Sequence, residues 1–223
     1  MKKYFLILFT LALASCEGSS NASKPIDRPK AEVSFVTTPH NIVEKMLDWC
    51  EPTKDDYIVD LGCGDGRIII TAAKKYGCKG CGYDIDPKLI AICKDRAKVE
   101  GVEDLVEFHQ QDIFETELPK KATIVTMFLL PEMNLRLMPY LQTLPDDVRV
   151  VSHHWEMPGV KPSKHEKVDN NNKNWPISNV YYFKTPMLVE ANWTPEPKTP
   201  ISIDFEKIKD ILKFTDETEP AKE

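Results

Sequence analysis

The chain has 223 residues, of which 42% are apolar and 29% are charged, and its formal net charge is -6. This length suffices for one well-packed domain with tails and is too short for two large domains. Proteins whose affinity rests on neutralising phosphates need clustered Lys and Arg, so the acidic balance argues against nucleic acid as a partner.

The first residues have the layout of a secretory signal. Lys2 and Lys3 precede an apolar run, Tyr4–Ala14, which is too short to span a bilayer comfortably. The tetrapeptide LASC that ends at Cys16 resembles the lipobox of bacterial lipoproteins, and this resemblance implies that Cys16 is acylated and becomes the new N-terminus. We therefore expect a signal peptide over residues 1–16 and a lipoprotein anchored to a membrane of the cell envelope. The alternative is an uncleaved hydrophobic N-terminus on a cytoplasmic protein.

A polar stretch separates this signal from the domain. Residues 17–33 are rich in Ser and Pro and lack an apolar period, which predicts a flexible linker. The domain is expected over residues 34–187. Its first helix is predicted from the stretch TTPHNIVEKMLDWC, with Thr38 as N-cap, Pro39 at the first helical position and one apolar face.

Strand and helix patterns then alternate along the chain. The expected elements are strands over residues 57–61, 79–85, 105–110, 122–130 and 148–153, and helices over residues 67–76, 87–100 and 132–144. Nearly continuous apolar strands between amphipathic helices predict an α/β fold, a doubly wound, Rossmann-like and mostly parallel sheet. Residues 164–168 and 180–186 predict a C-terminal antiparallel hairpin at one sheet edge. Residues 188–223 are expected to form a Pro-rich tail with a short amphipathic helix.

The turn after the first predicted strand contains alternate glycines, Gly62, Gly64 and Gly66. Glycines let the backbone approach a ligand closely, and the helix that follows offers N–H groups at its N-terminus. A dinucleotide site has the spacing G-x-G-x-x-G, which is missing here and argues against NAD. Asp60, two residues before the first glycine, would repel a pyrophosphate and attract an ammonium group.

Further acids follow the second and third predicted strands. Asp84 ends the second strand, where a carboxylate can accept both ribose hydroxyls, whereas Asp86 more simply caps the next helix. After the third strand, Asp112 is placed to receive an adenine amine, and Ile113 and Phe114 can pack on the base. A capping role for Asp84 and a plain turn role for Asp112 are the alternatives. An ammonium group, a ribose and an adenine together describe S-adenosylmethionine.

The stretches DLGCGDGR, GYDID and QQDIF, in this order and spacing, resemble the class I, seven-strand, S-adenosylmethionine-dependent methyltransferases from about Phe35 to about Pro186. More narrowly, FVTTP, ATIVTMFLLPEMN and RVVSHHWEM resemble bacterial relatives of the ATP synthase c-subunit lysine methyltransferases. The resemblance implies that Asp60 and the three glycines hold the methionyl part of the cofactor, Asp84 the ribose and Asp112 the adenine. It implies methyl transfer to a nitrogen acceptor, above all a protein lysine.

The groups that bind the methyl acceptor are expected at the carboxyl ends of the fourth and fifth strands. The chain reads MFLLPEMN where methyltransferases of planar amide or nucleobase nitrogens usually show an Asn-Pro-Pro-aromatic motif, which argues against DNA adenine and glutamine acceptors. Leu130, Pro131 and Asn134 are candidates for a narrow lysine channel, against a plain strand-to-helix turn. His153 and His154 are candidate bases or substrate contacts, against satisfied or exposed histidines.

Cysteine usage and export raise two open questions. Cys78 and Cys81 have redox-motif spacing but run into a predicted strand, so we expect core or loop residues and neither a redox pair nor a zinc site. S-adenosylmethionine is a cytosolic compound, so an exported domain has a second possible function, as a membrane-tethered module that binds the cofactor or a nucleoside without turnover. The intact glycines and acids favour the enzyme.

Overall fold

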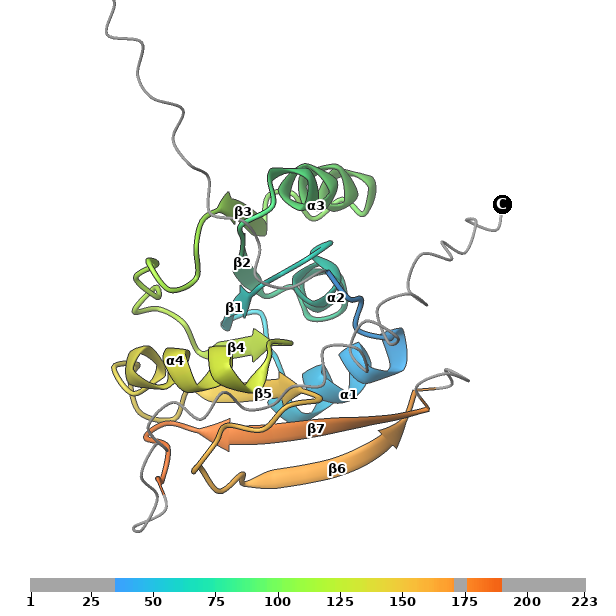
Figure 1. Ribbon diagram of the computed structural model, residues 1–223. Coiled ribbons are helices and arrows are strands. Elements are labelled where there is room, and N and C mark those ends of the chain that lie inside the picture. The colour runs from blue at the N-terminus through green and yellow to red at the C-terminus, as the bar shows by residue number, and fades with distance from the viewer. Residues whose placement is uncertain (1–34, 171–175, 190–223) are drawn as a thin grey trace, which may run out of the picture.

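A seven-stranded sheet forms the centre of the computed structural model, which describes residues 35–170 and 176–189 (Figure 1). The strands are β1 (Tyr57–Leu61), β2 (Lys79–Asp84), β3 (Val106–Gln110), β4 (Ile124–Met127), β5 (Arg149–His153), β6 (Lys164–Asp169) and β7 (Ile177–Lys184). The helices are α1 (His40–Cys50), α2 (Arg67–Tyr76), α3 (Pro87–Val99) and α4 (Pro131–Leu141). The predicted signal peptide with Cys16, the linker and the amphipathic segment of the tail lie outside the described residues.

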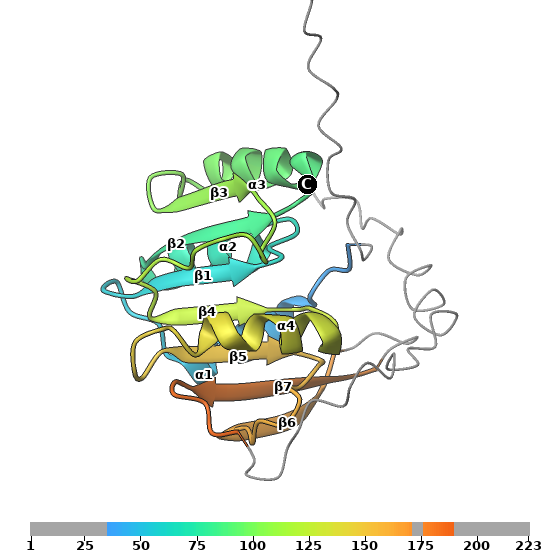
Figure 2. The ribbon, with the colours of Figure 1, turned by 60° about the vertical axis from the view of Figure 1, so that its left-hand side comes forward.

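The strand order is β3-β2-β1-β4-β5-β7-β6, and the first five strands are parallel. Helices cover both faces: α1, α2 and α3 pack on one, and α4 packs on the other (Figure 2). All four residues of β4 are buried, as are four of the five residues of β1, because a helix layer covers the sheet on each side. These observations confirm the predicted doubly wound α/β fold. No helix in the described part of the chain is long and apolar enough to span a bilayer.

The predicted C-terminal hairpin is also confirmed. Strand β7 pairs antiparallel with β6 on one side and with β5 on the other, so the hairpin closes the sheet edge next to β5. Strand β7 begins at Ile177, three residues earlier than the pattern predicts. Strand β4 is shorter than predicted and ends at Met127, because the chain then turns toward α4 and Leu129 packs against Gly62 of the glycine turn.

The prediction of Thr38 as the N-cap of α1 is wrong. The helix begins at His40, its N-cap is Pro39, and no side chain makes a capping hydrogen bond. The hydroxyl of Thr38 instead lies 3.3 Å from Nδ1 of His153, and its backbone oxygen accepts a 2.8 Å hydrogen bond from Arg67. The contact with His153 spans 115 residues of sequence, so a local capping pattern cannot predict it.

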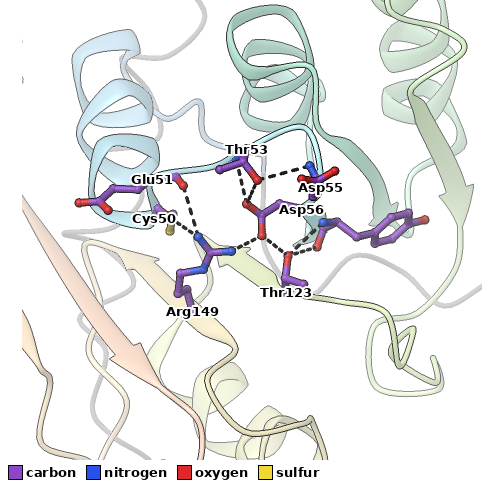
Figure 3. Close-up of polar contacts among 8 residues, drawn as sticks. Cys50, Glu51, Thr53, Asp55, Asp56, Thr123 and Arg149 are labelled. Carbon is purple, nitrogen blue, oxygen red and sulfur yellow. Dashed lines mark hydrogen bonds and ion pairs between the residues drawn. The ribbon is translucent and has the colours of Figure 1, made fainter.

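A polar network joins α1, β1 and β5 at the amino ends of the strands (Figure 3). The Arg149 guanidinium forms an ion pair with Asp56 and donates a 2.5 Å hydrogen bond to the carbonyl oxygen of Cys50, the last residue of α1. Asp56 also accepts hydrogen bonds from the hydroxyl of Thr123 (2.7 Å) and from the amide (2.8 Å) and hydroxyl (3.0 Å) of Thr53. Burial alone would raise the pKa of Asp56, but these donors and Arg149 hold it below its ordinary value.

Removing Arg149 should therefore destabilise the domain. We expect Arg149→Met to lower the free energy of unfolding by about 2–4 kcal/mol, because Asp56 would remain as a buried charge without its partner. Urea unfolding of the variant measures this loss. Lys184→Met is the matched control, since Lys184 is exposed and lies 3.8 Å from Asp147, and it should cost less than about 0.5 kcal/mol. Equal losses in the two variants would contradict the role of the network.

Candidate functional site

The predicted cofactor residues gather at the carboxyl ends of neighbouring strands. Asp60 lies near the end of β1, Asp84 ends β2, and Asp112 follows β3. Strand β1 pairs with β2 on one side and with β4 on the other, so the sheet changes direction of winding at β1. Open α/β sheets bind their ligands at the carboxyl ends of the strands beside such a switch point.

The glycine turn connects β1 to α2. Gly62, Gly64 and Gly66 all have positive φ angles, of 75°, 55° and 76°. A side chain on Gly66 would also meet the ring of Phe108 at 2.9 Å and the sulfur of Cys93 at 3.0 Å. The turn therefore has a conformational need for glycine, which is compatible with close approach to a ligand.

The carboxylate of Asp60 is almost completely enclosed, with 2% of the residue exposed. It accepts a 2.6 Å hydrogen bond from the Thr126 hydroxyl on β4. Burial raises the pKa of Asp60 to about 7, the Thr126 hydrogen bond opposes this shift only in part, and the nearby acids Asp84 and Asp65 add to it. A buried carboxylate with no cationic partner among these groups suits a ligand that brings an ammonium group.

Asp84 ties the glycine turn to the end of β2. One carboxylate oxygen accepts a hydrogen bond from the amide of Gly64, and the other accepts one from the amide of Asp86, each at 2.9 Å. Burial raises the pKa of Asp84 above its ordinary value despite these hydrogen bonds. A carboxylate has about four acceptor positions, so both oxygens keep capacity for ribose hydroxyls. The predicted capping role belongs to Asp86, whose side chain accepts the Lys88 amide at 2.8 Å at the start of α3.

Asp112 and Ile113 occupy the turn after β3. A carboxylate oxygen of Asp112 accepts the amide of Phe114 at 2.9 Å, so the side chain does serve the turn. The side chain of Ile113 is buried in the apolar layer that also contains residues of α4. The ring of Phe114 is half-buried, with the Arg136 guanidinium 3.6 Å from its centroid. The roles of Asp112 and Ile113 toward an adenine stay predictions.

Two arginines that the sequence analysis did not single out hold the turn in place. Arg67 donates to both carboxylate oxygens of Asp65, at 2.9 and 2.7 Å, and Arg96 of α3 forms an ion pair with Asp65 at 2.6 Å. Burial would raise the pKa of Asp65, but the two guanidinium groups keep it below its ordinary value. The adjacent DGR sequence hints at the first pair, whereas Arg96 lies 31 residues away from Asp65 and gives no local signal.

Asn134 is fully buried between α4 and the segment after β5. Its side-chain nitrogen donates to the carbonyl oxygens of Glu156, at 3.0 Å, and Trp155, at 3.4 Å. Its side-chain oxygen has no hydrogen-bond partner within the described residues, and a buried carboxylate oxygen of Glu132 has none there either. Leu130 is the N-cap of α4, and Pro131 is its first residue. A lysine channel at this place stays a prediction.

His153 ends β5 and His154 follows it, and the two side chains have different environments. His153 is completely buried, its ring nitrogens lie 3.3 Å from the Thr38 hydroxyl and 3.0 Å from the Ser178 hydroxyl, and burial lowers its pKa to about 3. His154 has a positive φ of 66°, and burial lowers its pKa to about 4. Both imidazoles are therefore neutral near pH 7, and His153 fits the structural alternative of a satisfied core histidine.

The cysteines of the described chain are free thiols. Cys78 and Cys81 are buried, which confirms that they are core residues, and burial raises the pKa of each above its ordinary value. Across residues 35–170 and 176–189, no group of three or more His, Cys, Asp or Glu side chains could hold a metal ion.

Known proteins share this arrangement of sequence and fold. The profile of a family described as "ANTKMT methyltransferase domain" matches residues 60–164. A protein-lysine N-methyltransferase from Saccharolobus islandicus (strain REY15A) is 40% identical over 144 residues, which are 64% of this chain and 89% of that relative. An ATP synthase c-subunit lysine N-methyltransferase from Homo sapiens is 37% identical over 106 residues, which are 47% of this chain and 45% of that relative. The similarity thus spans under half the length of the human protein.

One solved structure is similar over almost its whole length. The structure described as an RNA methyltransferase from Salinibacter ruber in complex with S-adenosyl-L-homocysteine has a TM-score of 0.62 and 36% sequence identity. The similarity covers 73% of this chain and 98% of that one.

The buried carboxyl group of Asp60 predicts that cofactor affinity depends on pH. With a pKa of about 7, Asp60 is mostly protonated at pH 6 and mostly ionised at pH 8, and only the ionised form attracts an ammonium group. We expect S-adenosylhomocysteine to bind roughly tenfold more weakly at pH 6 than at pH 8, measured by calorimetric titration. Asp60→Asn should bind weakly at both pH values.

Two variants serve as controls for this titration. Asp84→Ala keeps Asp60 and should weaken binding strongly at every pH, because it removes a proposed ribose partner while leaving the domain folded. Asp55→Asn changes an exposed carboxylate near the amino ends of the strands and should leave the pH dependence intact. Wild-type affinity that is flat between pH 6 and pH 8 would refute the role given to Asp60.

Proposed function

Because the chain belongs to the class I S-adenosylmethionine-dependent methyltransferases, we propose that it transfers a methyl group to the side-chain nitrogen of a protein lysine. The observation that carries this proposal is the similarity to the protein-lysine N-methyltransferase of Saccharolobus, which the chain covers almost completely. The chain is an enzyme, and S-adenosylmethionine is its cofactor. The fit of the site supports this cofactor, since Asp60 is a buried carboxylate that would accept the ammonium of the methionyl part.

The bound cofactor supplies both the methyl group and a neutral leaving group, because its sulfonium carries the positive charge before transfer. Asp60, the glycine turn and Asp84 would fix the orientation of the methyl group, and well-oriented reactants can lower the barrier to such a displacement by about 7–11 kcal/mol. The lysine must lose a proton before its nitrogen has a free lone pair. Enclosure of the lysine by the apolar residues of the acceptor side would favour its neutral form.

Two buried oxygens near the proposed acceptor side could accept hydrogen bonds from an amine. The buried side-chain oxygens of Asn134 and Glu132 are both hydrogen-bond acceptors that lack donors within the described residues. Both belong to the first turns of α4, which follows β4 directly, and β4 contacts Asp60 through Thr126. A lysine amine carries N–H donors, and it would reach these oxygens only if α4 or the segment after β5 moved, because both oxygens are enclosed in this structure.

An RNA base is the second candidate acceptor. The similarity to the Salinibacter structure favours it, since that structure is described as an RNA methyltransferase. The net charge of -6 and the absence of an Asn-Pro-Pro-aromatic motif weigh against it.

Methyl transfer to protein and to RNA can be measured side by side. We expect the purified chain to transfer label from methyl-labelled S-adenosylmethionine to proteins of its own cell extract, and acid hydrolysis should release methylated lysine. Asp84→Ala should lose nearly all of this transfer, and an exposed-site variant, Asp95→Ala, should keep it. If label appeared only in RNA under the same conditions, the methyl acceptor would be an RNA base and not a protein lysine.

The location of the enzyme is a separate proposal. The basic start, the short apolar run and the LASC tetrapeptide support a lipoprotein anchored through Cys16 in the cell envelope, with a cytoplasmic protein as the alternative. We expect labelled palmitate to be incorporated into the wild-type chain in a bacterial host and not into Cys16→Ser. Wild-type chain that stays unlabelled, in a host that labels its own lipoproteins, would favour the cytoplasmic alternative.

A further inference from the structure

The segment just before α1 lies beside the glycine turn. This segment, Phe35–Pro39, runs from α1 along the side of the sheet where the parallel strands end, as the blue trace of Figure 2 shows. The cofactor acids Asp60 and Asp84 are on the same side. The segment therefore borders the site from an element that belongs to neither β1 nor α2.

Phe35 makes the closest contact of this segment with the turn. A Cβ atom on Gly64 would lie 2.2 Å from Cε2 and 2.8 Å from Cδ2 of the Phe35 ring, so the ring packs directly on the backbone of Gly64. The amide of the same Gly64 is bound by Asp84. Phe35 is nevertheless 40% exposed, so one part of the ring touches the turn and another part faces outward.

Contacts with α2 and with β5 hold this segment in position. The backbone oxygen of Thr38 accepts the hydrogen bond from Arg67, which is itself fixed by Asp65 of the turn. The Thr38 hydroxyl contacts His153 at the end of β5, and only 4% of Thr38 is exposed. The segment is thus fastened to the cofactor side through Arg67 and to the acceptor side through His153.

We propose that Phe35 is a cofactor-binding residue whose ring forms the outer wall of the site over Gly64. This inference rests on the proposed cofactor site. A ligand whose ammonium is bound by Asp60 and whose ribose is bound by Asp84 runs along the turn past Gly64, where the ring lies. The ring then gains apolar contact with the ligand and shields the two carboxylates from water, which strengthens their interactions with the ligand.

The contact with the glycine turn does not use the whole ring. Phe35 is 40% exposed, so part of its ring surface is available to contact a ligand that lies along the turn. This arrangement gives a second reason why position 64 needs glycine, besides its positive φ: any side chain there would displace the ring of Phe35.

The test compares cofactor affinity, turnover and stability in the full chain. We expect Phe35→Ala to weaken the binding of S-adenosylmethionine and of S-adenosylhomocysteine about tenfold each, and to raise the KM for the cofactor equally. Because the substitution removes no group from the acceptor side, kcat at saturating cofactor should stay within about twofold of wild type, and Tm without ligand should be unchanged. Phe35→Tyr should restore the affinity.

The matched control is Val99→Ala, which removes an apolar side chain that is 84% exposed near the end of α3. It should leave cofactor affinity unchanged. Wild-type affinity in Phe35→Ala, or a loss that only accompanies a lower Tm, would overturn the role of Phe35 and leave the proposed function standing. A wild-type chain that is folded and binds neither compound would instead remove the proposed function, and this inference with it.

Discussion

The hydrogen bond from the Gly64 amide to the Asp84 carboxylate is the contact on which the rest of the site depends. It fixes the turn after β1 to the end of β2, and these two strands are already held in register by their parallel pairing. The second carboxylate oxygen of Asp84 accepts a hydrogen bond from the amide of Asp86, so the same side chain also holds the residue that caps α3. The wall that Phe35 forms over the turn presupposes this position of Gly64.

Three acids surround the turn, and their partners divide them into two kinds. Asp65 has two guanidinium partners, Arg67 and Arg96, which keep its pKa low and make it a structural fastening between α2 and α3. Asp60 and Asp84 have hydroxyl and amide donors instead, and burial raises the pKa of each. A carboxylate without a cationic partner among the described residues is a place where a ligand can supply one, and this separates the two proposed binding acids from Asp65.

Much of the architecture could be predicted because its signals are local. Buried parallel strands read as short apolar runs, amphipathic helices read as periodic ones, and an acid at the end of a strand is visible in the sequence itself. Thr38 is a residue whose contacts could not be predicted from local signals. Its sequence context favours a cap, but its hydroxyl contacts His153 and its carbonyl binds Arg67, and both partners become neighbours only in the folded sheet. Arg96 reaches Asp65 in the same way, across 31 residues.

The end of β5 is held in place by the last strand of the described domain. The backbone oxygen of Asn179 on β7 accepts the His154 amide at 2.7 Å, and Ser178 contacts His153, while Thr38 approaches that same histidine from the first described residues. A nascent chain on the ribosome lacks β7 until almost the whole domain has emerged, so it cannot yet order the end of β5. Synthesis runs from the N-terminus, so the contacts that β7 makes with the end of β5 form only when the domain is almost complete.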